Sequence, residues 1–265
     1  MVRTAARKNT QVRKAVVRKP DPRSRLNLMR ILALDTASRT CSAALMEDGA
    51  LVAEWNCGNG RTHATHLMVM LDQILRLSGV AISNIDGFAV SRGPGSFTGL
   101  RIGISTIKAL ALSMGKPLVG VSSLEALALQ ASHFPGLICA LLDARKGEVY
   151  EARFRFSQGG MQKLGPERVC TPLAAVADIH EPCLFIGDGA VAYADEIIRA
   201  LGENVRMASV IDNAIRAACV AILAHDRLCA GDADDLACFE PCYIRKSEAE
   251  MKRKSGVRVD SLGGF

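Results

Sequence analysis

The chain has 265 residues, of which 49% are hydrophobic and 23% are charged. This composition is ordinary for a folded globular protein and excludes a wholly disordered chain. The most apolar stretch, from Ile102 to Val121, is interrupted by lysines, a glycine and a proline, so the sequence predicts no membrane-spanning helix.

The net charge of +6 is unevenly distributed along the chain. Residues 1–28 hold nine basic residues and one acidic residue, a net charge of +8, and the remainder carries −2. We interpret residues 1–28 as a disordered basic tail, or as an upstream start assigned in place of Met29. A transit peptide and a nucleic-acid-binding arm are the alternatives. The body itself is not a basic platform for nucleic acid.

The nine cysteines are an odd number and include no Cys-x-x-Cys pair. Most of them lie among apolar neighbours, as small core residues do. No apolar stretch follows the charged N-terminus, so the sequence lacks a secretory signal. These features predict a reducing, cytoplasmic location.

Folded sequence is expected to begin at Met29 with a meander of three strands, since short apolar runs alternate there with turn residues. Helices and strands then alternate, as apolar periodicity and the Gly and Pro breaks indicate. The expected strands are 30–34, 41–46, 51–55, 85–90 and 118–121, and the expected helices are 63–77, 98–114 and 123–131.

The second half repeats this order. An apolar run at 137–142 ends in Asp143, as the run at 30–34 ends in Asp35, which indicates a duplicated α/β unit. The expected elements are strands at 148–156 and 184–186 and helices at 190–201 and 213–228. We therefore expect an N-terminal lobe at 29–130 completed by the helix 213–228, a C-terminal lobe at 131–212 and a flexible tail at 246–265.

A glycine-rich loop leading into the helix at 98–114 is the sharpest motif. Its candidate residues are Gly93, Pro94, Gly95, Ser96, Phe97, Thr98, Gly99 and Arg101. Free N–H groups at a helix N-terminus attract anions, so phosphate binding is one hypothesis. The alternative is a tight turn that lets the helix pack closely against its neighbours. The Lys-Ser/Thr pair of a Walker A loop is absent.

Asp35 and Asp143 are candidates for a cation and nucleotide site between the lobes. A phosphate cradle after a strand needs glycines, whereas the turn after Asp35 begins with Thr36 and the turn after Asp143 is also bulky. The sequence therefore predicts a degenerate nucleotide cleft.

Other catalytic and metal signals are weak. His63 and His66, three residues apart, have no nearby acid, and Cys238 and Cys242 have no second pair, so we expect no metal site. The sequence contains no Gly-x-Ser-x-Gly elbow, which argues against a serine hydrolase.

Five ordered motifs resemble the bacterial TsaB (YeaZ) family. They are Met29–Ala37, Arg92–Ile104, Gly120–Leu124, Asp143–Tyr150 and Pro241–Arg245. The likeness covers about 29–245, and residues 1–28 have no counterpart in it. The resemblance implies a two-lobed actin/Hsp70/sugar-kinase (ASKHA) fold, in which each lobe is a mixed sheet flanked by helices.

The resemblance also implies a function. Members of this family are regarded as non-catalytic subunits in the synthesis of N6-threonylcarbamoyladenosine at position 37 of tRNA. They dimerise with the transferase TsaD, and the ATPase TsaE joins the pair. By this likeness the chain needs no cofactor of its own, ATP and a divalent metal act in the partners, and tRNA is met only through the complex. An independent ATPase or kinase of the same fold is the alternative.

The partner surface is expected on the helices 63–77 and 98–114. The first helix has more apolar residues than one buried stripe needs, and the second has small residues that allow close approach. The expected contact residues are Leu67, Val69, Met70, Leu77, Gly103 and Ile107. The same surface is expected to support a homodimer when TsaD is absent, and burial of both faces within one lobe is the alternative.

Overall fold

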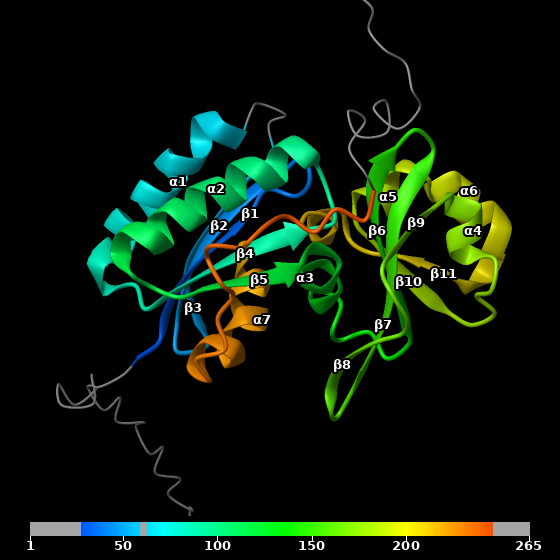
Figure 1. The fold of residues 1–265 in the computed structure, drawn as a ribbon. Coiled ribbons are helices and arrows are strands. Elements are labelled where there is room, and N and C mark those ends of the chain that lie inside the picture. The colour runs from blue at the N-terminus through cyan, green and yellow to red at the C-terminus, as the bar shows by residue number, and fades with distance from the viewer. Residues whose placement is uncertain (1–27, 59–62, 246–265) are drawn as a thin grey trace, which may run out of the picture.

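Two mixed β-sheets with flanking helices form the two lobes of the computed structural model (Figure 1). The structure describes residues 28–58 and 63–245. The expectations for residues 1–27 and for the tail at 246–265 therefore fall outside the described residues.

The first sheet has the strand order β3-β2-β1-β4-β5. The expected meander pairs antiparallel, while β4 and β5 add in parallel to the other side of β1. The strands are β1 (Arg30–Asp35), β2 (Cys41–Glu47), β3 (Ala50–Cys57), β4 (Gly87–Gly93) and β5 (Leu118–Ser122).

The second sheet repeats this topology with the order β11-β10-β6-β7-β8. Strands β6, β7 and β8 pair antiparallel, and β10 and β11 add in parallel beside β6, as β4 and β5 do beside β1. The strands are β6 (Leu137–Arg145), β7 (Glu148–Ser157), β8 (Gly160–Lys163), β9 (Arg168–Cys170), β10 (Cys183–Ile186) and β11 (Val205–Met207). The predicted duplication and the two-lobed ASKHA fold are confirmed.

Helices cover both faces of the first sheet. Figure 1 shows α1 (His63–Ser78) and α2 (Phe97–Met114) on one face and α7 (Ala217–Cys229) on the other. Although α7 follows the second lobe in sequence, its first amide, at Ala217, donates to Ser42 Oγ of β2 at 2.8 Å. The remaining helices are α3 (Ser123–Leu129), α4 (Pro172–Val176), α5 (Asp188–Ala192) and α6 (Ala194–Leu201), with short 3-10 turns η2 (Ile82–Asn84), η3 (Gly202–Asn204) and η4 (Val210–Asn213).

Some expected boundaries were wrong. The helix expected at 190–201 is two helices that meet at Tyr193, where the backbone leaves helical geometry. The helix expected from 213 begins at Ala217, because the preceding residues form η4. Among the described residues, no helix has the length and apolar character needed to cross a membrane.

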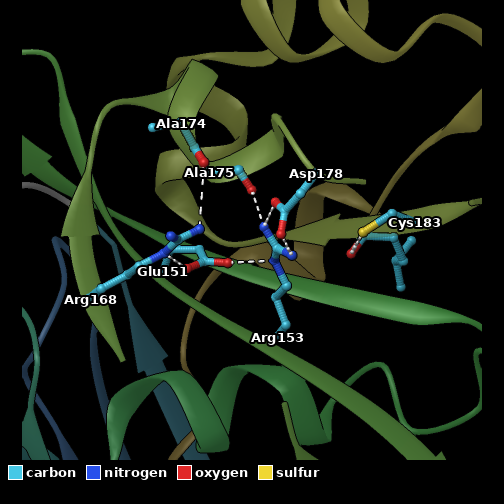
Figure 2. Close-up of polar contacts among 8 residues, drawn as sticks. Glu151, Arg153, Arg168, Ala174, Ala175, Asp178 and Cys183 are labelled. Carbon is cyan, nitrogen blue, oxygen red and sulfur yellow. Dashed lines mark hydrogen bonds and ion pairs between the residues drawn. The ribbon is translucent and has the colours of Figure 1, made fainter. Parts of the chain in front are cut away.

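An ion-pair network stabilises the second lobe (Figure 2). The Glu151 carboxylate is only 3% exposed and accepts hydrogen bonds from Arg153 Nε at 2.8 Å and Arg168 Nε at 2.6 Å. Arg153 also binds Asp178, and this hydrogen bond lowers the pKa of Asp178 to about 2. The network joins β7 and β9 to the segment after α4, and we assign it a structural role.

Candidate interlobe site

Three aspartates gather where the strands β1 and β6 end between the lobes. Asp35 ends β1, and the nearby charge of Asp188 adds to the larger effect of burial in raising the pKa of Asp35. Asp188 begins α5 and its Oδ1 accepts a hydrogen bond from the Asp143 amide at 2.9 Å. The structure therefore brings Asp35 and Asp143 to one region, as expected, and adds Asp188 between them.

Asp35 is fully buried, and burial raises its pKa to about 7. The nearby Ser91 hydroxyl and the Ala37 amide, which donates to Asp35 Oδ1 at 3.4 Å, oppose this shift only in part. No described residue donates a hydrogen bond to the other oxygen, Oδ2. Because a buried carboxyl group with so few hydrogen-bond partners favours its neutral form, Asp35 offers a cation less charge than an ordinary aspartate does.

The turn after Asp35 is filled by the chain itself. Thr36 is fully buried, and its hydroxyl donates to the Gly99 carbonyl at 2.7 Å. A Cβ at Gly99 would lie 2.0 Å from the Thr36 carbonyl oxygen, and one at Gly103 would lie 2.2 Å from Thr36 Oγ1. Helix α2 thus packs directly on the turn, at the place where a phosphate cradle would need open backbone N–H groups.

The glycine-rich loop makes close contacts inside the protein. The Ser96 amide donates to the Ala37 carbonyl at 2.6 Å, and Ser96 Oγ caps α2 by accepting from the Gly99 amide. A Cβ at Gly95 would lie 2.4 Å from the Ala37 carbonyl oxygen. This geometry favours the close-packing interpretation of the motif, and anion binding by the loop stays a prediction.

A C-terminal strap, residues 239–245, crosses from the first lobe to the second (Figure 1). In the first lobe, the Cys242 amide donates to the Arg92 carbonyl at 2.6 Å, and the Tyr243 ring stacks on Phe97 with 4.6 Å between centroids. In the second lobe, Arg245 donates to the Ala144 carbonyl at 3.1 Å. The strap therefore connects the glycine-rich loop with the end of β6.

Sequence reasoning missed Asp188 and the path of the strap. A signal for Asp188 was present, since Gly187-Asp188-Gly189 directly follows a strand, as Asp35 follows one. The sequence held no comparable signal for the strap, because its contacts depend on how the two lobes are placed.

The expected partner residues divide into two groups. Val69 and Leu77 are 56% and 79% exposed. The expectation that Met70 lies on an exposed surface is wrong, because Met70 is 3% exposed and packs in the core. Three further expected contact residues, namely Leu67, Gly103 and Ile107, are also buried, and their part in a partner surface stays a prediction.

A metal site is not formed by the described residues, which contain no suitable cluster of His, Cys, Asp and Glu side chains. The side chain of His63 lies outside the described part. The expectation that this chain holds no metal stays a prediction.

Comparison with known proteins gives consistent matches. A family model described as "TsaD: tRNA N6-adenosine threonylcarbamoyltransferase" matches residues 59–253. The Bacillus subtilis protein named "tRNA threonylcarbamoyladenosine biosynthesis protein TsaB" is 31% identical over 227 residues, which cover 84% of this chain and 97% of the relative. The Escherichia coli protein of the same name is 42% identical over 135 residues, which cover 50% of this chain and 58% of the relative.

Solved structures also match. A Pseudomonas aeruginosa protein described as similar to peptidase YEAZ superposes with a TM-score of 0.71 at 30% identity, covering 82% of this chain and all of that one. A structure described as YeaZ from the same organism gives a TM-score of 0.69 at 29% identity.

Proposed function

The chain belongs to the bacterial TsaB family, and we propose that it serves the synthesis of N6-threonylcarbamoyladenosine on tRNA as a non-catalytic subunit. Its partner in this proposal is a TsaD-type transferase, with a TsaE-type ATPase joining the pair. ATP and the divalent metal act in those partners, and the complex works in the cytoplasm. Family membership supports the pathway, and the interlobe geometry supports the non-catalytic role.

The observation that carries the non-catalytic role is the filled turn after Asp35. Thr36 and Ala37 are buried against the glycine-rich loop, so their backbone is not open to a phosphate group. Burial also raises the pKa of Asp35 to about 7, so this carboxyl group carries less charge near neutral pH than an ordinary aspartate. An independent ATPase or kinase would need both features to be different.

Exposed apolar side chains on α1 and α2 support the partner surface. Met68, Val69 and Leu77 on α1 are exposed, as are Leu112 and Met114 on α2. Of these, Met68 lines a hollow of about 480 Å³ between α1, the segment 79–82 and Leu110, with Asp72 and Arg76 also in its lining. Apolar side chains gathered around a hollow with a polar rim are typical of a protein interface. In the absence of the transferase, a second copy of the chain is the expected occupant.

Reconstitution tests this proposal. The transferase, the TsaE-type ATPase and the adenylate-forming enzyme are incubated with tRNA, with and without this chain, and modified adenosine is counted by mass spectrometry. We expect modification only with the chain present, and no ATP turnover by the chain alone. Undiminished modification without the chain, or rapid ATP turnover by it, would contradict the proposal.

A further inference from the structure

Exposed basic side chains lie around the mouth of the interlobe site. Arg39 follows β1 in the first lobe, and Arg101 is the fifth residue of α2. Arg145 and Lys146 form the tip of the turn between β6 and β7 in the second lobe. All four are exposed, whereas the body of the chain has a slight net negative charge.

A continuous series of contacts places these residues on one rim. Arg39 is near enough to Asp188 to lower its pKa, against the larger effect of burial, which raises it. Asp188 accepts from the Asp143 amide, and Asp143 Oδ1 accepts from the Arg145 amide at 2.8 Å. The rim thus runs from the first lobe to the second.

The strap completes the rim on the other side. Arg245 binds the Ala144 carbonyl, next to Arg145. Two residues earlier, the Tyr243 hydroxyl accepts from Arg101 Nε at 3.2 Å. The Arg101 guanidinium also lies 3.9 Å from the centre of the Phe97 ring. Tyr243 is 37% exposed, so an aromatic surface lies among the cations.

The carboxylates near the rim are already engaged in hydrogen bonds or ion pairs, or have a raised pKa. Glu148 pairs with Arg245 at 2.9 Å, and burial raises the pKa values of Asp35 and Asp188. Within 28–58 and 63–245, no carboxylate oxygen lies within 4 Å of a side-chain nitrogen of Arg39, Arg101 or Arg145. These three arginines can therefore bind an external anion.

The turn that contains Arg145 has an unfavourable backbone conformation. Arg145 and Lys146 have φ values of 61° and 57°, in the left-handed region where Gly, Asn and Asp are the usual residues. Long cationic side chains at these two positions are not explained by the turn itself. They place two charges at the point of the hairpin, next to the interlobe mouth.

We propose that this rim, defined as Arg39, Arg101, Arg145 and Tyr243, contacts the sugar-phosphate backbone of the tRNA while the complex holds it. The proposal rests on the proposed function. The cations are spread over both lobes and lie outside the filled turn, which suits an extended polyanion better than a single nucleotide. Arginines contact phosphates and exposed aromatic rings stack on unpaired bases, so the residue types fit RNA.

Two substitutions remove charge without disturbing the fold. Arg145→Gly suits the left-handed backbone, and Arg39→Gln keeps a polar side chain at an exposed site. Arg199→Gln on α6 is the matched control, because Arg199 is exposed and its Nε donates only to the Asp195 carbonyl. Each full-length variant is assembled with the transferase, and its affinity for fluorescent tRNA is measured at several salt concentrations.

We expect the double variant Arg39→Gln/Arg145→Gly to bind tRNA roughly three- to tenfold more weakly, with the slope of log K against log salt reduced by about 0.9 per lost contact. Arg199→Gln should bind as the wild type does. An unchanged affinity and slope, an equal loss in the control, or a loss confined to ATP binding would overturn the proposal. If the wild-type complex still modifies tRNA in that case, the proposed function stands and only the rim is wrong.

Discussion

At the scale of single residues, Gly99 gives the most direct test of the packing between the loop and the turn after Asp35. A Cβ at Gly99 would overlap the Thr36 carbonyl oxygen, which is backbone and cannot move aside cheaply. We expect Gly99→Ala to lower the free energy of unfolding by about 1–3 kcal/mol, as overpacking in a tight core does. Urea denaturation measures this change.

Gly159→Ala is the control for this substitution. The nearest atom to a Cβ at Gly159 is Ser157 Oγ at 3.7 Å, an ordinary contact, and its backbone is not left-handed. We expect its unfolding midpoint to stay close to that of the wild type. Equal stability of both variants would mean that the loop does not press on Thr36.

Asp35 predicts a specific pH dependence. Its folded pKa of about 7 lies above the unfolded value near 3.8, so the folded state keeps a proton that the unfolded state loses between these values. Wild-type stability should therefore fall as the pH rises from about 4 to 7 and then level off. Asp35→Asn cannot ionise and lacks this pH dependence. The free energy of unfolding of the variant, relative to that of the wild type, should therefore rise by on the order of 2 kcal/mol from pH 5 to pH 8.

Urea unfolding of both proteins at several pH values measures this difference. A constant gap between wild type and Asp35→Asn across the range would mean that Asp35 ionises normally in the folded protein. If the wild type instead became more stable relative to the variant as the pH rises, the folded protein would stabilise the charged form of Asp35.

At the scale of elements, α1 illustrates what the sequence could and could not predict. The buried residues Leu67, Met70, Leu71 and Ile74 follow the i, i+3, i+4, i+7 spacing of one stripe. The pattern therefore held the signal that Met70 is a core residue, and the expectation of an exposed Met70 overlooked it. Exposure of Val69 and Leu77 was predicted from the same apolar excess and is confirmed.

Substitutions at a buried and at an exposed position of α1 should have different effects, one on stability and the other on partner binding. Met70→Ala should lower the free energy of unfolding by about 2–5 kcal/mol, because it leaves a cavity in the core. Val69→Asp should change stability by less than about 0.5 kcal/mol and weaken binding of the transferase, because Val69 is exposed. Thermal melts and pull-down of the partner measure the two effects. Normal partner binding by Val69→Asp would move the interface off this face of α1.

The two long helices of the first lobe were predicted well, and several short elements were not. The helices 63–77 and 98–114 differ from α1 and α2 by one residue at one end. Strands β9 and β11 and helix α4 have five residues or fewer. A hydrophobic repeat cannot be recognised in segments this short. They form because the second sheet offers edges and a face to pair with or pack on, which only the tertiary structure supplies.

At the scale of the whole molecule, the repeated strand–Asp pattern was enough to predict the duplicated lobes. The composition of the interlobe site was only partly predictable. Asp35 and Asp143 follow from strand ends, whereas the strap joins residues more than 100 positions apart in sequence, as Arg245 and Ala144 are. Contacts of this kind depend on the placement of the lobes.

The uneven distribution of charge along the chain predicts how tightly the isolated protein binds tRNA. The body has a net charge of −2 and includes the basic rim, while residues 1–28 carry +8. We expect the isolated chain starting at Met29 to bind tRNA weakly, and the full-length chain to bind more tightly with a steeper salt dependence. Filter binding at several salt concentrations measures both. Tight, salt-sensitive binding by the shortened chain alone would contradict this expectation.

The central claim is that the interlobe site of this chain does no chemistry and that the chain acts through its partner. The rate of threonylcarbamoyladenosine formation by the reconstituted complex carrying Asp35→Asn tests this claim most directly. We predict a rate equal to that of the wild-type complex, since Asp35 is fully buried and the turn beside it is closed to a phosphate group, whereas omission of the chain abolishes formation. A folded Asp35→Asn variant that is as inactive as the omission would contradict the account and place catalysis in this cleft.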